Sequence, residues 1–223
     1  MNDPATRAIP LFPLPLVLFP EARLPLHIFE PRYRQMLVDV SGGRRQFGIV
    51  RHDGAREERD IPPGTVGCIA HLESSTTLPD GRSNIVVRGT WRFALEKIAP
   101  STAPYLMALV SPVTDRDEPD DALNVAADAL RTIVRRVATA ARSIADEADS
   151  ELPLPDDPRM LSFAVAQSID LELTVRQSIL ENVSPLGRLR QLRELLERLT
   201  SSVEERALAH HRAKSNGHGP HAS

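Results

Sequence analysis

The sequence predicts an α+β protein in which a partly open β-barrel with one helix precedes a helical bundle. Residues 8–115 contain about six short apolar runs separated by turns rich in proline and glycine, a pattern typical of short strands. Strand signals stop near Pro112 to Pro119, and beyond them apolar residues recur every seven positions, as in amphipathic helices. We therefore expect a barrel over 8–115, a helical bundle over 119–206 and a disordered tail over 207–223.

The first half is predicted to begin with a proline-rich edge strand at Ile9–Leu18, because an edge tolerates missing backbone donors. A second apolar run, Leu24–Phe29, precedes Pro31, which suits the first turn of a helix ending near Val40. Turns such as Pro62-Pro63-Gly64 separate the remaining strands. These are expected at Phe47–Arg51, Thr65–Glu73, Ser83–Gly89, Trp91–Ile98 and Tyr105–Val110.

The second half is predicted to contain four helices. Leu123, Leu130, Val137 and Ile144 indicate a long amphipathic helix over about 120–146. After a proline-containing connection at 151–158, Pro158 can open a second helix to about residue 169. A third, short helix is expected where Thr174 and Gln177 form a capping-box pattern. Ser184-Pro185 opens the fourth, whose apolar face is formed by Leu189, Leu192, Leu196, Leu199 and Val203.

Three sequence blocks resemble the substrate-binding domain of Lon proteases. The first runs from Leu18 to Met36, the second from Gly64 to Gly89, and the third from Asp170 through a helix ending near Leu199. This resemblance implies a barrel like that of the pseudouridine-synthase (PUA) type and a role in binding polypeptides. It also implies structural roles for the motif residues Phe19, Pro20, Pro25, Leu26, Phe29, Glu30, Arg32, Tyr33, Gly64, Gly67, Gly81 and Gly89.

The ATPase and the serine–lysine peptidase of Lon proteases have no counterpart in the motifs of this sequence. A phosphate-binding loop needs a lysine after a glycine-rich turn, and neither of the two lysines, Lys97 and Lys214, follows one. The hydroxyls of Ser74-Ser75-Thr76-Thr77 have no base or glycine elbow nearby. We therefore expect no catalytic residues and no cofactor.

The cysteine and the histidines do not predict a metal site. Cys68, the one cysteine, excludes an internal disulfide, indicates a reducing compartment and is expected to be a buried, inert thiol. His27, His52 and His71 are too far apart in sequence to form a recognisable ligand pair. The tail contains His210, His211, His218 and His221, which we interpret as part of a disordered end.

The cluster Glu30-Pro31-Arg32-Tyr33 has two interpretations. A carboxylate beside an arginine and a phenol can do acid–base chemistry. The favoured interpretation is structural: Glu30 places a negative charge at a helix N-terminus, Arg32 pairs with it, and Tyr33 packs with Phe29, which we expect to be buried.

Composition leaves two binding functions open. The formal net charge of −3 gives no general attraction to nucleic acid, and no apolar run approaches the roughly 18 residues that span a bilayer, so we expect a cytoplasmic protein. RNA binding is the alternative, because Arg44, Arg45, Arg51, Arg56 and Arg59 form a basic stretch, although one Trp and two Tyr offer little base stacking.

The favoured function is binding of unfolded or tagged polypeptides as an adaptor or holder for a separate protease. The resemblance implies an apolar groove or a sheet edge that takes an extended segment. The candidates are the proline-rich edge from Ile9 to Pro25 and a cleft between the barrel and the helical bundle.

Overall fold

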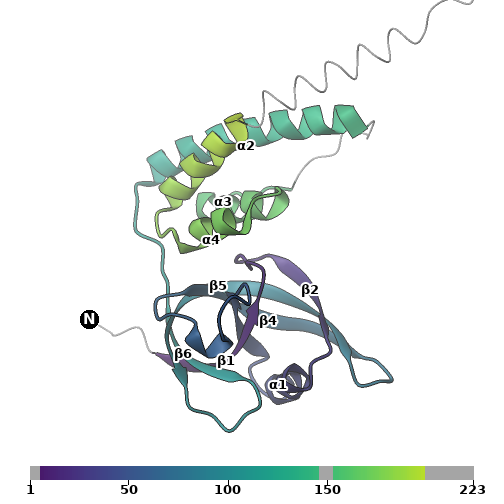
Figure 1. Cartoon of the computed structure of the whole chain (residues 1–223). Helices are drawn as coiled ribbons and strands as arrows, with labels where there is room; N and C mark the ends of the chain where they lie inside the picture. The colour runs from purple at the N-terminus through teal and green to yellow at the C-terminus, as the bar shows by residue number, and fades with distance from the viewer. Residues whose placement is uncertain (1–5, 146–152, 199–223) are drawn as a thin grey trace, which may run out of the picture. The chain divides into compact units, whose positions relative to one another are not determined.

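The computed structural model describes residues 6–145 and 153–198, and these belong to two compact units (Figure 1). The first unit comprises the chain up to Arg116 together with 166–183, and the second comprises 117–165 and the chain from Ser184 onward. The break at residue 116 lies within the predicted connection. Segment 166–183, which the sequence analysis assigned to the helical half, belongs to the unit that contains the strands.

The first unit contains a mixed six-stranded sheet with the order β2-β5-β4-β3-β1-β6. β5 also pairs with β6, so β6, β1, β3, β4 and β5 form a closed cycle of pairings. The β1–β3 pair is parallel and the other pairs are antiparallel. The strands are β1 Arg7–Leu14, β2 Arg23–Ile28, β3 Gln46–Arg51, β4 Val66–Thr77, β5 Ser83–Ala99 and β6 Leu106–Pro112.

The proline-rich strand β1 is an interior strand, so the predicted edge position was wrong. Its first half pairs with β6 and its second half with β3, through Arg7–Leu11 and Leu11–Leu14 respectively. The Leu14 carbonyl accepts a hydrogen bond from His52 N–H, so Pro13 beside it directs its nitrogen away from β3. By the same alternation Pro10 points away from β6. Each proline therefore faces the side on which its half of the strand has no partner.

β5 is one strand of 17 residues, where the sequence predicted two, the first of which ended at Gly89. Gly89 lies within the strand, and the backbone of the β1–β2 connection packs directly against it. Its N–H donates to Ala22 O and its carbonyl accepts from Glu21 N–H, at 2.9 Å each. A Cβ at this position would lie 2.1 Å from the Phe19 carbonyl oxygen. The glycine therefore permits backbone contact and does not end the strand.

Helix α1, Pro31–Ser41, confirms the predicted proline start and ends one residue beyond the predicted Val40, with Gly42 as its C-cap. Its buried face consists of Tyr33, Met36, Leu37 and Val40, spaced three and four residues apart. The short 3₁₀ helix Glu58–Asp60 was not predicted, because three polar residues carry no periodic signal.

Helix α4, Leu173–Glu181, belongs to the first unit. Its N-cap is Glu172, so the predicted capping box at Thr174 is wrong. Gln177 Nε2 instead donates to the Val66 carbonyl at 3.0 Å, and Arg176 lies 5.1 Å from the Phe19 ring centre. Gln177, which the local pattern assigned to a cap, is therefore used for a tertiary contact with strand β4.

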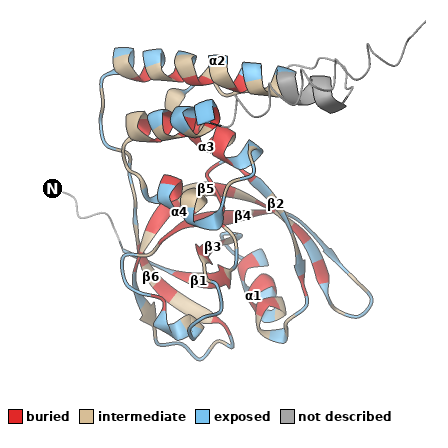
Figure 2. Cartoon of the chain, turned by 45° about the horizontal axis from the view of Figure 1, so that its top comes forward, coloured by how far each residue is buried: buried red, intermediate tan, exposed pale blue. Residues whose placement is uncertain are grey.

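The second unit contains α2, Asp120–Ala145, most of α3, Pro158–Ser168, and a helical segment at 185–198. The predicted bounds of these helices agree with the described residues, and Figure 2 shows buried and exposed positions alternating along α2. The Arg188 side chain is fully buried, donates to Ser162 Oγ at 2.9 Å and lies 4.2 Å from the Phe163 ring centre.

Several predictions concern residues outside the described ranges. These are the end of the fourth helix at Leu199 and Val203, and the histidine-containing tail over 207–223. None of the helices in the described part of the chain is long and apolar enough to cross a membrane.

Candidate functional site

The Glu30–Tyr33 cluster joins the start of α1 to the 3₁₀ helix. Arg32 Nε donates to Glu30 at 2.9 Å, and its two terminal nitrogens donate to both carboxylate oxygens of Glu58. The hydrogen bonds to Glu58 raise the pKa of Arg32 above its usual range. Burial, reinforced by the Glu58 charge, raises the pKa of the Tyr33 phenol. A phenol held neutral beside a permanently paired arginine favours a structural role over acid–base chemistry.

Phe29 is not the buried partner of Tyr33, so that part of the prediction is wrong. Its side chain is 60% exposed, whereas Tyr33 packs against Phe12 with ring centres 4.0 Å apart. Successive strand residues face opposite sides, and Ile28 takes the buried position at the end of β2. Phe29 therefore points away from the core, with its ring centre 6.2 Å from that of His27.

The glycines of the predicted motif meet two different requirements. Gly64 and Gly81 have φ of +84° and +79°, a conformation that favours glycine in turns. Gly67 and Gly89 have no room for a side chain, and a Cβ at Gly67 would lie 2.4 Å from the Ile49 carbonyl oxygen. Phe19 and Pro20 are buried, Leu26 is half-buried, and Pro25 is exposed on β2.

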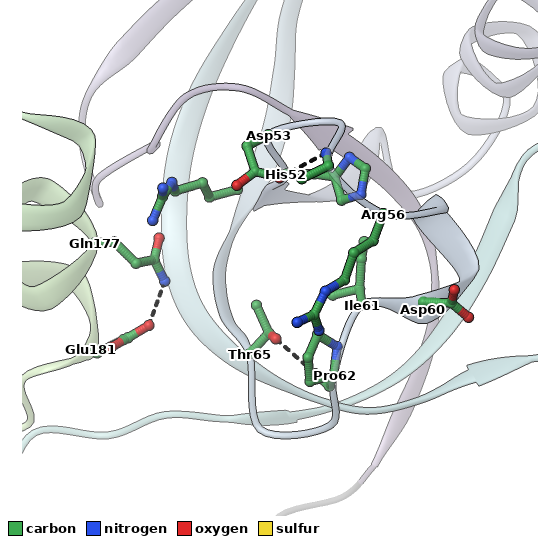
Figure 3. Close-up of a pocket in the computed structure, with 11 residues that line it drawn as sticks. His52, Asp53, Arg56, Asp60, Ile61, Pro62, Thr65, Gln177 and Glu181 are labelled. Atoms are coloured by element: carbon green, nitrogen blue, oxygen red, sulfur yellow. Dashed lines mark hydrogen bonds between the residues drawn. The ribbon is translucent and has the colours of Figure 1, made fainter.

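A polar pocket of about 400 Å³ lies between the segment after β3 and helix α4, all within the first unit (Figure 3). Arg51 and Arg56 line it, but so do three carboxylates: Asp53, Asp60 and Glu181. A hydrogen bond from the Ala55 N–H lowers the pKa of Asp53, and Glu181 accepts from Gln177 at 2.7 Å. Positive and negative charges nearly balance, so the pocket does not extend the basic stretch into a phosphate-binding surface.

This pocket contains no activated hydroxyl at Thr65, and the described residues contain no cluster of metal ligands. The Thr65 hydroxyl in this pocket donates to the Pro62 carbonyl at 2.7 Å and has no base beside it. No group of three potential metal ligands occurs among the described side chains. Figure 3 shows His52 among the lining residues; its Nδ1 accepts from the Gly54 N–H, and its Nε2 is buried without a hydrogen-bond partner in the described part of the chain.

Cys68 is fully buried, as the sequence predicted, and burial raises the pKa of its thiol to about 12. At pH 8 the thiolate population is therefore negligible, and reagents cannot reach the sulfur. We expect less than about a tenth of the native protein to react with Ellman's reagent within an hour, with complete reaction in denaturant. Fast labelling of the native protein would contradict this burial.

Two strand edges flank β5 in the region where β2, β5 and β4 lie side by side. β4 pairs with β3 only over Cys68–His71, so Ser74–Thr77 have β5 on one side and no strand of the described chain on the other. β2 likewise pairs with β5 alone. This part of the sheet therefore has two open edges.

The open edges differ in the backbone groups that they present. Leu78 N–H donates to the Arg82 carbonyl, so these two residues form a hydrogen-bonded pair. In an antiparallel hairpin such pairs alternate with pairs that are not hydrogen-bonded to each other. Thr77 and Ser75 are in pairs of the second kind, so they direct their N–H and C=O away from β5. The same alternation across β5 directs Pro25 and His27 of β2 outward. Proline has no N–H, so the β2 edge lacks a central donor. The β4 edge offers a complete donor–acceptor set at Ser75 and Thr77.

An open groove of about 710 Å³ lies beside the β4 edge, between β4 and helix α1. We call it the β4–α1 groove. Its β4 wall includes Ser75 and Thr77, and its α1 wall includes Arg34 and Val38. Val38 is 68% exposed and supplies an apolar surface. A strand edge facing a helix across a groove is an arrangement that can take an extended peptide segment.

The chain thus contains an α+β fold with an open strand edge beside a groove, and its sequence matches a known family. Residues 8–198 match the model of the ATP-dependent protease La (LON) substrate-binding domain. The chain therefore belongs to this family.

Relatives and solved structures agree with this assignment. The chain is 27% identical over 197 residues to the Lon protease of Anaeromyxobacter dehalogenans, and 29% identical over 213 residues to Lon protease 2 of Herpetosiphon aurantiacus. These matches cover 85% and 92% of this chain but only 23% and 25% of the relatives. The chain thus spans about a quarter of the length of these curated relatives.

The N-terminal domain of Lon protease from the Mycobacterium avium complex has a similar fold, with a TM-score of 0.62 and 19% identity. That match covers 86% of this chain and 98% of the other. A Lon N-terminal domain protein from Xanthomonas campestris matches with a TM-score of 0.59 and 24% identity, covering 83% of this chain and 96% of the other.

Proposed function

We propose that this protein binds extended polypeptide substrates at the open β4 edge and presents them for proteolysis without cleaving them itself. The observation that carries the proposal is the outward N–H and C=O of Ser75 and Thr77 beside the β4–α1 groove. Main-chain hydrogen bonds recognise any extended segment, which suits a domain that must accept many sequences. Membership of a family described as substrate-binding supports the same conclusion.

The β4 edge is not the proline-rich edge from Ile9 to Pro25 that the sequence favoured as the binding surface. β1 has partners on both sides, and the β2 edge has Pro25 at a central outward position. We further propose that the cycle of strand pairings is a PUA-like barrel, that the protein is cytoplasmic, and that a separate protease receives the bound segment.

A proline substitution at the β4 edge tests the site. Ser75→Pro removes an N–H that points away from β5, so the β4–β5 ladder keeps its hydrogen bonds while the outward donor is lost. We expect about tenfold weaker binding of fluorescein-labelled unfolded casein. One hydrogen bond to the added strand is lost, and the proline ring occupies space that this strand would need. Fluorescence anisotropy measures the affinity.

His27→Pro is the matched control, because it removes an outward N–H from the other open edge. It should leave casein binding unchanged. Equal weakening by both substitutions, with unchanged melting temperatures, would remove β4 as the binding edge.

RNA binding, the alternative from the sequence, is an outcome of the same assay. Affinity for RNA should fall steeply as salt rises from 50 to about 300 mM, because phosphate contacts release counterions. Strand addition with apolar contacts should change little over that range. Tight, salt-sensitive RNA binding without casein binding would replace the proposal.

A further inference from the structure

We propose that the β4–α1 groove selects extended segments that carry a carboxylate, and that Arg34 is the residue that recognises it. This inference rests on the proposed polypeptide binding and adds the chemistry of the preferred substrate. Among the described residues that line the groove, Arg34 is the one with a formal charge. The other walls are hydroxyl, amide or apolar groups.

Arg34 has no ion-pair partner in the described part of the chain, although carboxylates lie nearby in sequence. Asp80 is the acidic residue of the adjacent turn, and it is held by Arg82, whose Nε donates to it at 2.6 Å and whose backbone N–H donates at 3.0 Å. Asp39 on α1 accepts from Gln35 and from Tyr105. The groove therefore presents an uncompensated positive charge.

The position of the Arg34 guanidinium is set by the turn that it contacts. A Cβ on Gly81 would lie 2.1 Å from Arg34 Nη2, so the guanidinium packs directly against this glycine. Gly81 has φ of +79° between β4 and β5. Gly81 thus allows this close approach in addition to its positive φ. A guanidinium supported in this way is better placed for a carboxylate than a freely rotating side chain.

A strand added to β4 would bring alternate side chains to the Arg34 side of the sheet. Ser75, Thr77 and Ser83 line the groove, and Thr77 pairs with Ser83, so their side chains lie on the face of the sheet that carries the groove. Side chains two residues apart on an added strand lie on the same face. One such position can contact the exposed Val38 and another Arg34, which predicts a preference for an apolar and an acidic residue spaced by two.

The test uses three labelled, end-blocked peptides of eight residues with alternating valine and threonine and one central Glu, Gln or Lys. The expected order of affinity is Glu, then Gln, then Lys, with about a fivefold difference between Glu and Gln for one partly exposed ion pair. The Glu preference should shrink as salt rises, because exposed charges are screened. Anisotropy titrations at two salt concentrations measure both effects.

Arg34→Gln should abolish the difference between the Glu and Gln peptides, because the affinity of the Glu peptide should fall to that of the Gln peptide. Arg44→Gln is the matched control: it removes the same charge from an exposed residue that does not line the groove and should keep the preference. Equal affinities for the Glu and Gln peptides, or a Glu preference that survives Arg34→Gln, overturn this inference alone. Binding of none of the three peptides overturns it together with the proposed strand addition.

Discussion

Arg92→Leu is expected to lower the free energy of unfolding of the first unit by about 3 to 5 kcal/mol, because it breaks a buried charged network. The Arg92 side chain is 4% exposed. It donates to the carbonyls of Leu180 and Asn182 at 2.7 and 3.0 Å and to the Asp115 carboxylate. Leucine leaves the Asp115 charge without this partner and leaves both helix-end carbonyls without this donor.

Urea unfolding followed by the fluorescence of Trp91, the one tryptophan, measures this loss beside the altered residue. Arg116→Leu is the control, since Arg116 is exposed, and it should change stability by less than about 0.5 kcal/mol. A loss below about 1 kcal/mol for Arg92→Leu would mean that the docking of α4 does not depend on this network.

Gly89→Ala is the second large effect, with an expected loss of about 3 kcal/mol from overpacking. The added methyl group would lie 2.1 Å from the Phe19 carbonyl oxygen and 3.2 Å from Cys68 Sγ. The first of these atoms belongs to the backbone, so it moves only if the β1–β2 connection moves. We expect this shift to disturb the hydrogen bonds between Gly89 and residues 21 and 22.

Gly42→Ala is the matched control, because a Cβ there meets no atom within 4 Å and its φ of −79° suits alanine. It should be neutral or stabilise by a few tenths of a kcal/mol through the unfolded chain. Thermal melts of both variants make the comparison. Equal melting temperatures for the two would contradict the crowding at Gly89.

Features set by neighbouring residues were predictable from the sequence. Pro31 begins α1, Gly64 and Gly81 adopt positive φ, and the helical bounds near Asp120 and Pro158 agree with the structure. Each depends on backbone preference or on a periodic apolar pattern, which a short window of sequence contains.

Features set by distant partners were not predictable. β1 appeared to be an edge strand because prolines suit edges, but its two halves pair on opposite sides. Gln177 appeared to be part of a capping box, but it contacts Val66, 111 residues away. Glu58, which binds Arg32, lies 26 residues from it in a segment without a regular pattern.

The site proposed above is a sheet edge, as the resemblance implied, but it is not the proline-rich edge that the sequence favoured. The resemblance gave strand addition at a sheet edge, but the choice of edge depends on which backbone groups point outward. That direction follows from the register of β4 and β2 on β5, which apolar patterns do not specify to one residue. No sequence pattern pointed to Arg34. Among the described residues it lacks an ion-pair partner because Arg82 forms the ion pair with Asp80, and the sequence does not show which arginine does so.

Pro25 has a consequence for the behaviour of the protein at high concentration. A sheet with two competent edges can join its copies end to end, so that each added molecule offers a fresh edge and fibres grow without limit. Here one side of the three-stranded region lacks an amide at the centre of β2. If a second copy docked its β2 strand on β4, Pro25 could not donate a hydrogen bond to β4. Each further copy added in this direction would lack the same hydrogen bond, which disfavours repeated growth. Pro25 thus disfavours polymerisation through β2, while the β4 edge stays open.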